Sequence, residues 1–104
     1  MSQPPVKLPE ECETMAEVRI GVDNTDRELV ALLERRFGYM RAAARIKPTR
    51  EAVRDEERKA SVIAAAVADA EARGLPGPVI AELWDRLVEG SIAYEFEVWD
   101  ATRS

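Results

Sequence analysis

One apolar pattern in this sequence is too long for the rest of the chain to cover. Between Met15 and Ile46, apolar residues recur at the spacing of one helix face, at Met15, Val18, Val22, Leu29, Leu32, Leu33, Met40 and Ala43. Thr14 and Glu17 can form a capping box at its start. Pro48 ends the pattern, because the residue before a proline disfavours helical geometry. Such a helix is about 48 Å long.

The remainder predicts two shorter helices, at about 55–73 and about 78–102, with Gly74 and Pro76 as the stop signal between them. No segment alternates polar and apolar residues over the length of a strand, so we expect an all-α fold. Residues 1–13, which contain three prolines, are expected to form an irregular arm before a single helical domain, 14–104.

A compact chain of 104 residues has a radius of gyration near ~13 Å, so two short helices cannot cover the long one. We therefore expect an intertwined helical homodimer in which the long helices of two chains pair. The alternative is a monomeric bundle in which the long helix breaks at Gly21 or Gly38.

The composition excludes several function classes. Lys and Arg total 15 against 20 Asp and Glu, a net charge of −5, which argues against a nucleic-acid module. The chain has no His and one Cys, Cys12, so a Cys/His zinc site and a Ser-His or Cys-His nucleophile are excluded. With no phosphate-binding glycine motif and no metal-ligand cluster, no cofactor is expected. Without an apolar leader or membrane span, we expect a cytoplasmic protein.

Charged residues on core-facing helix positions are costly unless they are paired or used. Arg36 falls on the apolar face of the long helix, and Lys47, 11 residues later, shares that face, so the two could hold a small anion. A structural salt bridge for Arg36 and a helix-end cation for Lys47 are the alternatives. Arg19 points elsewhere, but in an antiparallel pair of long helices it can reach the middle of the other chain; otherwise it is a surface arginine.

The two shorter helices add four candidates. Ser91 and Glu95 are one turn apart on the third helix, and Glu95 lies among apolar residues, where desolvation favours a neutral carboxyl that donates a hydrogen bond. An exposed or Arg-paired glutamate is the alternative. On the second helix, Asp55 is a candidate N-cap, and Arg58 is in line with the apolar stripe within an otherwise solvated charge run.

Taken in order, these residues resemble the all-helical chorismate mutase family, including its isochorismate pyruvate lyase branch, from about Leu8 to Arg103. The matching pieces are Glu17-Val-Arg19, Val22-Asp23, Asp26, Leu32-Leu33-Glu-Arg35-Arg36, Ala42-Ala-Ala-Arg45-Ile-Lys47, Val53-Arg-Asp55-Glu-Glu-Arg58, Gly74-Leu75 with Pro78, and Ile92-Ala93 before Glu95.

The resemblance implies an intertwined dimer with two active sites that bind a small dicarboxylate. Lys47 would contact its ether oxygen and a carboxylate, Glu95 would hydrogen-bond that ether oxygen, and Arg36 would bind a carboxylate. Arg19 would come from the partner chain to bind a carboxylate, and the remaining substrate contacts would be Asp55, Arg58 and Ser91.

The activity implied first is the pericyclic rearrangement of chorismate to prephenate, in the shikimate-pathway branch toward phenylalanine and tyrosine. It needs oriented binding and electrostatic stabilisation, without a nucleophile or metal. The alternatives are elimination of pyruvate from isochorismate to give salicylate, a mutase acting on an amino analogue, and a non-catalytic helical dimer that binds a partner or an anion. Lys59 stands where the mutase branch often has an acidic residue.

Overall fold

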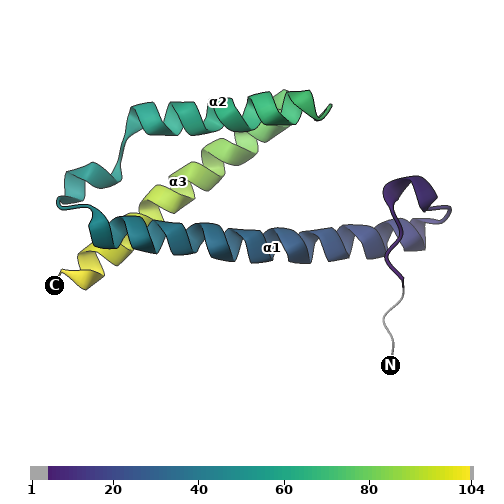
Figure 1. Ribbon diagram of the computed structural model, residues 1–104, viewed down its shortest axis with the longest axis horizontal. Coiled ribbons are helices and arrows are strands. Elements are labelled where there is room, and N and C mark those ends of the chain that lie inside the picture. Colours follow the sequence, from purple (N-terminus) through teal and green to yellow (C-terminus); the bar gives the residue numbers. More distant parts are fainter. Residues whose placement is uncertain (1–4, 104) are drawn as a thin grey trace. The chain divides into compact units, whose positions relative to one another are not determined.

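The computed structural model describes residues 5–103, and this range contains helices and no strands (Figure 1). The α-helices are α1 (Met15–Ile46), α2 (Glu56–Ala72) and α3 (Gly77–Thr102). Two short 3-10 turns, η1 (Pro9–Glu11) and η2 (Arg50–Val53), lie in segments for which no helix was expected. The all-α prediction is confirmed, and α1 has the predicted bounds. Residues 1–4 of the expected arm and Ser104 lie outside the described residues.

The chain divides into two compact units, Met1–Arg36 (the first unit) and Phe37–Ser104 (the second unit). Helix α1 runs through the division and is continuous at both Gly21 and Gly38, so the predicted alternative of a helix broken at either glycine is wrong. Its length follows from its two ends, a capping box at Thr14 and the proline after Lys47.

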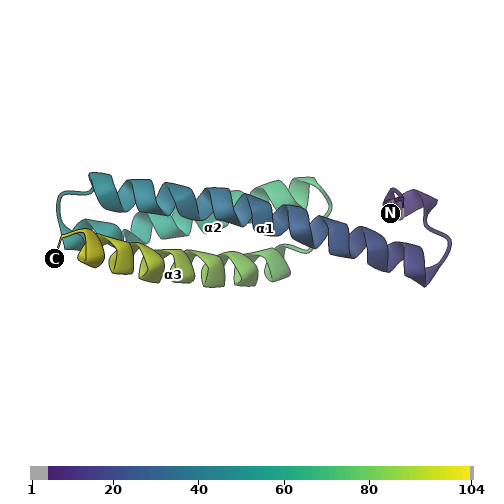
Figure 2. The same cartoon turned by 90° about the horizontal axis from the view of Figure 1, so that it is seen from below.

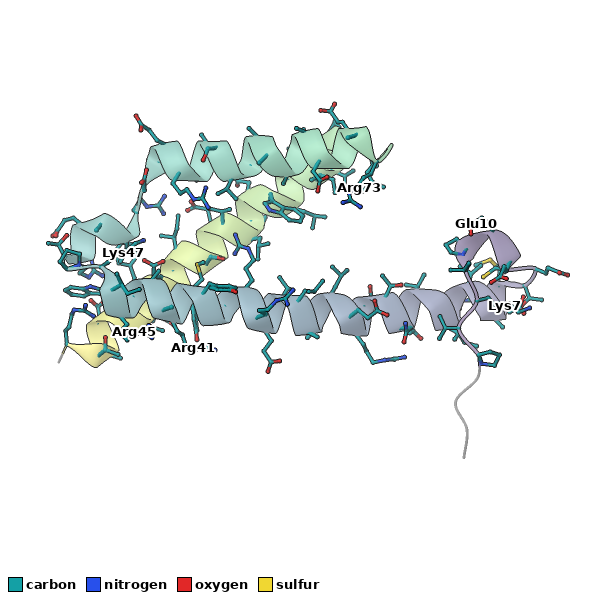
Figure 3. The ribbon with its side chains drawn as sticks, viewed as in Figure 1. Lys7, Glu10, Arg41, Arg45, Lys47 and Arg73 are labelled. Atoms are coloured by element: carbon teal, nitrogen blue, oxygen red, sulfur yellow. The ribbon has the colours of Figure 1, made fainter. Side chains whose placement is uncertain are left out.

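In the first unit, the described part of the arm is attached to the start of α1. Thr14 Oγ1 accepts a hydrogen bond from Glu17 N (3.2 Å), and Glu17 Oε1 accepts one from Thr14 N (3.2 Å), which confirms the capping box. Glu17 also forms an ion pair with Lys7, whose side chain is labelled in Figure 3. The hydrogen bond from Lys7 is the main reason that the pKa of Glu17 is lowered to about 2.

The apolar stripe on the first unit's part of α1 faces solvent in this single chain. Five large apolar side chains of this stripe are more than a third exposed: Met15, Val18, Val22, Leu29 and Leu32. The buried residue of α1 is Ala44, in the second unit. Apolar side chains in a row along one helix face are typical of a surface that another element covers.

In the second unit, α2 and α3 pack against each other and are joined by a short turn (Figures 1 and 2). Gly74 ends α2 with a φ of 76°, a conformation that other residues adopt only with strain. The core is built on three buried side chains, Val53, Val88 and Ile92, with Val62, Ile63, Trp84, Phe96 and Trp99 packed against them. Residues from η2, α2 and α3 therefore share one core.

Candidate functional site

Lys47 is held at the point where α1 ends. Its backbone N–H still donates to Ala43 O (2.9 Å), while Pro48 prevents another helical turn. Its ammonium donates to Glu95 Oε2 at 2.7 Å and to the Val53 carbonyl oxygen at 3.4 Å, and its side chain is 29% exposed. The ammonium of Lys47, which is labelled in Figure 3, is thus held by two hydrogen bonds while its side chain stays partly exposed.

Glu95 and Ser91 are buried polar residues of α3, at 4% and 3% exposure. Ser91 Oγ donates to the Leu87 carbonyl oxygen one turn earlier (2.7 Å), and Glu95 accepts from Lys47. No buried side-chain nitrogen or oxygen within residues 5–103 lacks a hydrogen-bond partner. The predicted burial of Glu95 is confirmed, but its partner is the ammonium of Lys47 instead of an arginine.

Asp55 and Arg58 lie together at the start of α2. Asp55 is the N-cap, and its Oδ1 accepts a hydrogen bond from Arg58 N at 3.0 Å. Both side chains are exposed, so the structure places them at the surface of the second unit.

The next residue, Lys59, belongs to a set of ion pairs that the sequence did not reveal. Its ammonium lies 2.9 Å from Glu89 Oε2 and 3.2 Å from Asp85 Oδ1, and Arg54 also binds Glu89, at 2.9 Å. Hydrogen bonds from Arg54 and Lys59 lower the pKa of Glu89 to about 2. The segment expected to be a solvated charge run is therefore partly tied to α3.

Arg19 and Arg36 belong to the first unit, where Arg19 is exposed and Arg36 is half-buried. Of the predicted site residues, the structure brings together Lys47, at the end of α1, and Glu95 of α3, and separately Asp55 and Arg58 at the start of α2. Ser91 lies one turn before Glu95 on α3, and its printed hydrogen bond is to Leu87.

The arrangement suits electrostatic chemistry on an anionic ligand. A reachable ammonium beside a buried carboxyl can bind an oxygen that gains negative charge, and its surroundings are already ordered. The described residues hold no cluster of His, Cys, Asp or Glu that could bind a metal ion. No helix between residues 5 and 103 is long and apolar enough to span a membrane.

Comparison with known proteins adds two findings. The family described as chorismate mutase type II matches residues 18–96, which is more than half of the chain and includes Lys47, Ser91 and Glu95. A protein of Pseudomonas aeruginosa named isochorismate pyruvate lyase is 33% identical over 98 residues, covering 94% of this chain and 97% of that protein. The chain belongs to the chorismate mutase type II family.

Proposed function

We propose that this protein is a chorismate mutase that rearranges chorismate to prephenate by electrostatic stabilisation of the transition state. The observation that carries this proposal is the Lys47–Glu95 pair, in which a partly exposed ammonium lies 2.7 Å from a buried carboxyl. The rearrangement breaks a C–O bond and places negative charge on the ether oxygen, so an oriented cation at that oxygen lowers the barrier.

Lys47 is the main catalytic group in this proposal. Its ammonium has three N–H donors, and the contacts with Glu95 and the Val53 carbonyl leave donor capacity for a ligand oxygen. Because the α1 terminus and two hydrogen bonds already fix the side chain, little reorganisation is needed when substrate arrives.

Glu95 acts as a hydrogen-bond donor to the same ether oxygen. A substrate oxygen that accepts from Lys47 competes with Glu95 for that ammonium. The neutral carboxyl stabilises the developing negative charge, whereas the anion would repel it.

The other contacts are proposed from the family resemblance. Arg36 binds one substrate carboxylate within the chain, and Arg19 of the partner subunit binds a carboxylate. Asp55, Arg58 and Ser91 complete the ligand contacts. Arginine suits carboxylate recognition because its guanidinium can donate two parallel hydrogen bonds.

A homodimer is part of the proposal. The exposed apolar stripe of α1, which includes Val22, Leu29 and Leu32, supports it, since pairing with the same helix of a second chain would remove these side chains from water. We assign the enzyme to aromatic amino acid biosynthesis in the cytoplasm.

A second candidate is an isochorismate pyruvate lyase, favoured by the Pseudomonas aeruginosa relative of that name. Lys59 also favours it: where the mutase branch often has an acid, this chain has an ammonium bound to Glu89 and Asp85. Both reactions are pericyclic, so the Lys47–Glu95 pair could serve either.

The test is to incubate the purified protein separately with chorismate and with isochorismate and to identify the products by chromatography. Prephenate from chorismate supports the proposal. Salicylate and pyruvate from isochorismate, without prephenate from chorismate, support the second candidate. No turnover of either substrate would overturn both in favour of a non-catalytic helical dimer.

A further inference from the structure

One face of α3 contacts Lys47 at both ends of the residue. Glu95, Trp99 and Arg103 follow one another at intervals of four, so their side chains are neighbours on the helix surface. Glu95 accepts a hydrogen bond from the Lys47 ammonium (2.7 Å). Trp99 Nε1 and Arg103 Nη2 donate to the Lys47 carbonyl oxygen, at 3.1 and 2.9 Å. Glu95 and Trp99 of α3, together with the C-cap residue Arg103, therefore contact both the tip and the backbone of this lysine.

Arg103 also binds the last turn of α1. Its Nη1 donates to the carbonyl oxygen of Ala44 (3.0 Å) and its Nη2 to that of Arg45 (3.4 Å). The final carbonyls of a helix lack partners within the helix, and a cation there also interacts favourably with the helix dipole. The guanidinium lies over the Trp99 ring, 4.3 Å from its centroid. Trp99 itself packs against the core of the second unit.

We propose that Trp99 and Arg103 are positioning residues for Lys47. They fix the backbone at the end of α1, and from this fixed backbone the side chain of Lys47 reaches Glu95. The inference rests on the proposed function, because it assumes that Lys47 is the catalytic cation. Displacement of a catalytic group by about 1 Å can cost a large factor in rate, so loss of these contacts should lower kcat more than it raises KM.

The first experiment measures kcat and KM for chorismate in the Trp99→Phe and Arg103→Met variants. Trp99→Phe keeps an aromatic ring but removes the N–H donor, and we expect kcat to fall about tenfold or more with KM changed less than about threefold. Arg103→Lys keeps a cation at the α1 terminus and should recover part of the loss. Trp84→Phe is the matched control, since Trp84 packs against the same core, and it should leave kcat near the wild-type value. Equal losses in Trp99→Phe and Trp84→Phe would overturn the proposal.

The second experiment needs no turnover. Reductive methylation of the folded protein, followed by peptide mass spectrometry, gives the reaction rate of Lys47 beside those of Lys7 and Lys59. We expect the Lys47 rate to rise severalfold in Trp99→Phe and Arg103→Met, while the rates of Lys7 and Lys59 stay unchanged, because their ion pairs involve neither Trp99 nor Arg103.

The labelling result distinguishes a failure of the proposed function from a failure of the positioning role. If the wild-type protein turns over neither substrate, the proposed function fails, and a selective rise at Lys47 still establishes the positioning role. An unchanged Lys47 rate in both variants, or an equal rise at all three lysines, overturns the positioning role even if the enzyme is active.

Discussion

Each end of α1 has a lysine paired with a glutamate, and the two pairs differ in their surroundings. Near the helix start, Lys7 pairs with Glu17, and the two side chains are 37% and 25% exposed. At the helix end, Lys47 pairs with Glu95, and the corresponding values are 29% and 5%. The lysines are similarly exposed, so the difference lies in the glutamates.

Because of this difference, we interpret the Lys7–Glu17 pair as an attachment of the arm to α1 and the Lys47–Glu95 pair as the candidate reaction centre. Glu17 is bound by Lys7 and by the backbone of Glu13 and Thr14, so its role is to hold the arm and begin the helix. Glu95 is enclosed by the core of the second unit, where charge is weakly screened and a change in its partner has a large electrostatic effect. Similar residue types thus serve stability at one end and, in our proposal, catalysis at the other.

The largest expected effect is that of removing the Lys47 ammonium. Lys47→Ala should lower kcat/KM by about 1,000-fold, the loss typical when a group that stabilises transition-state charge is deleted. The matched variant is Lys7→Ala, which removes the other paired ammonium and should leave kcat/KM near wild type. Steady-state assays with chorismate give kcat/KM for both variants, and circular dichroism establishes that both are folded. Similar activity in the two variants would show that the candidate centre is misplaced.

A somewhat smaller loss of activity is expected when a charged residue is introduced into the exposed apolar stripe on the first unit's part of α1. Leu29→Glu should prevent the proposed dimer from forming and lower activity about 100-fold at low protein concentration, because a carboxylate is unfavourable in an apolar interface. Val79→Glu is the control: Val79 is similarly exposed, at 53% against 51% for Leu29, but lies on α3. Sedimentation measures the particle mass. A Leu29→Glu protein that remains dimeric would argue against pairing through this stripe.

Replacing Glu95 by its neutral analogue should preserve most of the rate, because the proposed role of Glu95 is to donate a hydrogen bond. Glu95→Gln keeps the size and a hydrogen-bond donor, so we expect kcat within about tenfold of wild type, whereas Glu95→Leu removes the donor and should lose more. The measurement is kcat with chorismate for the wild type and both variants. A Glu95→Leu protein as active as Glu95→Gln would contradict the donor role given to Glu95.

The smallest effect concerns the attachment at the other end of α1. The pKa of Glu17 is about 2 in the folded chain, below its usual value of about 4.3. Glu17 therefore stabilises the fold above about pH 4.5 and loses this contribution as the pH falls toward 2. The urea midpoint of the wild type should exceed that of Glu17→Gln at neutral pH, and the difference between the two midpoints should disappear in acid. The enzymatic activity of Glu17→Gln should equal that of the wild type. A difference between the midpoints that does not change with pH would contradict this assignment.

The features that could be predicted from the sequence are those determined by residues close to them along the chain. Thr14, Glu17 and Pro48 act within a few residues of the helix ends that they determine, so the bounds of α1 follow from the sequence. Gly74 likewise marks the end of α2. The burial of Ser91 and Glu95 follows from the apolar residues at helical spacing around them.

Contacts between distant residues could not be predicted in the same way. Lys47 and Glu95 each looked like a charge on an apolar face, but nothing in the sequence states that these two meet, because 48 positions separate them. Arg103 resembles an ordinary terminal cation until its bonds to the end of α1 are seen. Lys59 lies in a charge run, and its partners Asp85 and Glu89 become neighbours only when α2 packs on α3.

In the proposed dimer, each site needs Lys47 from one chain and Arg19 from the other, and mixing Arg19→Ala with Lys47→Ala protein tests this requirement. Arg19→Ala and Lys47→Ala proteins are unfolded together, refolded and assayed with chorismate. Random pairing makes half of the dimers mixed, and each mixed dimer contains one intact site, so we predict recovery of about one quarter of wild-type activity. No recovery on mixing, or an Arg19→Ala protein that is fully active alone, would contradict the account.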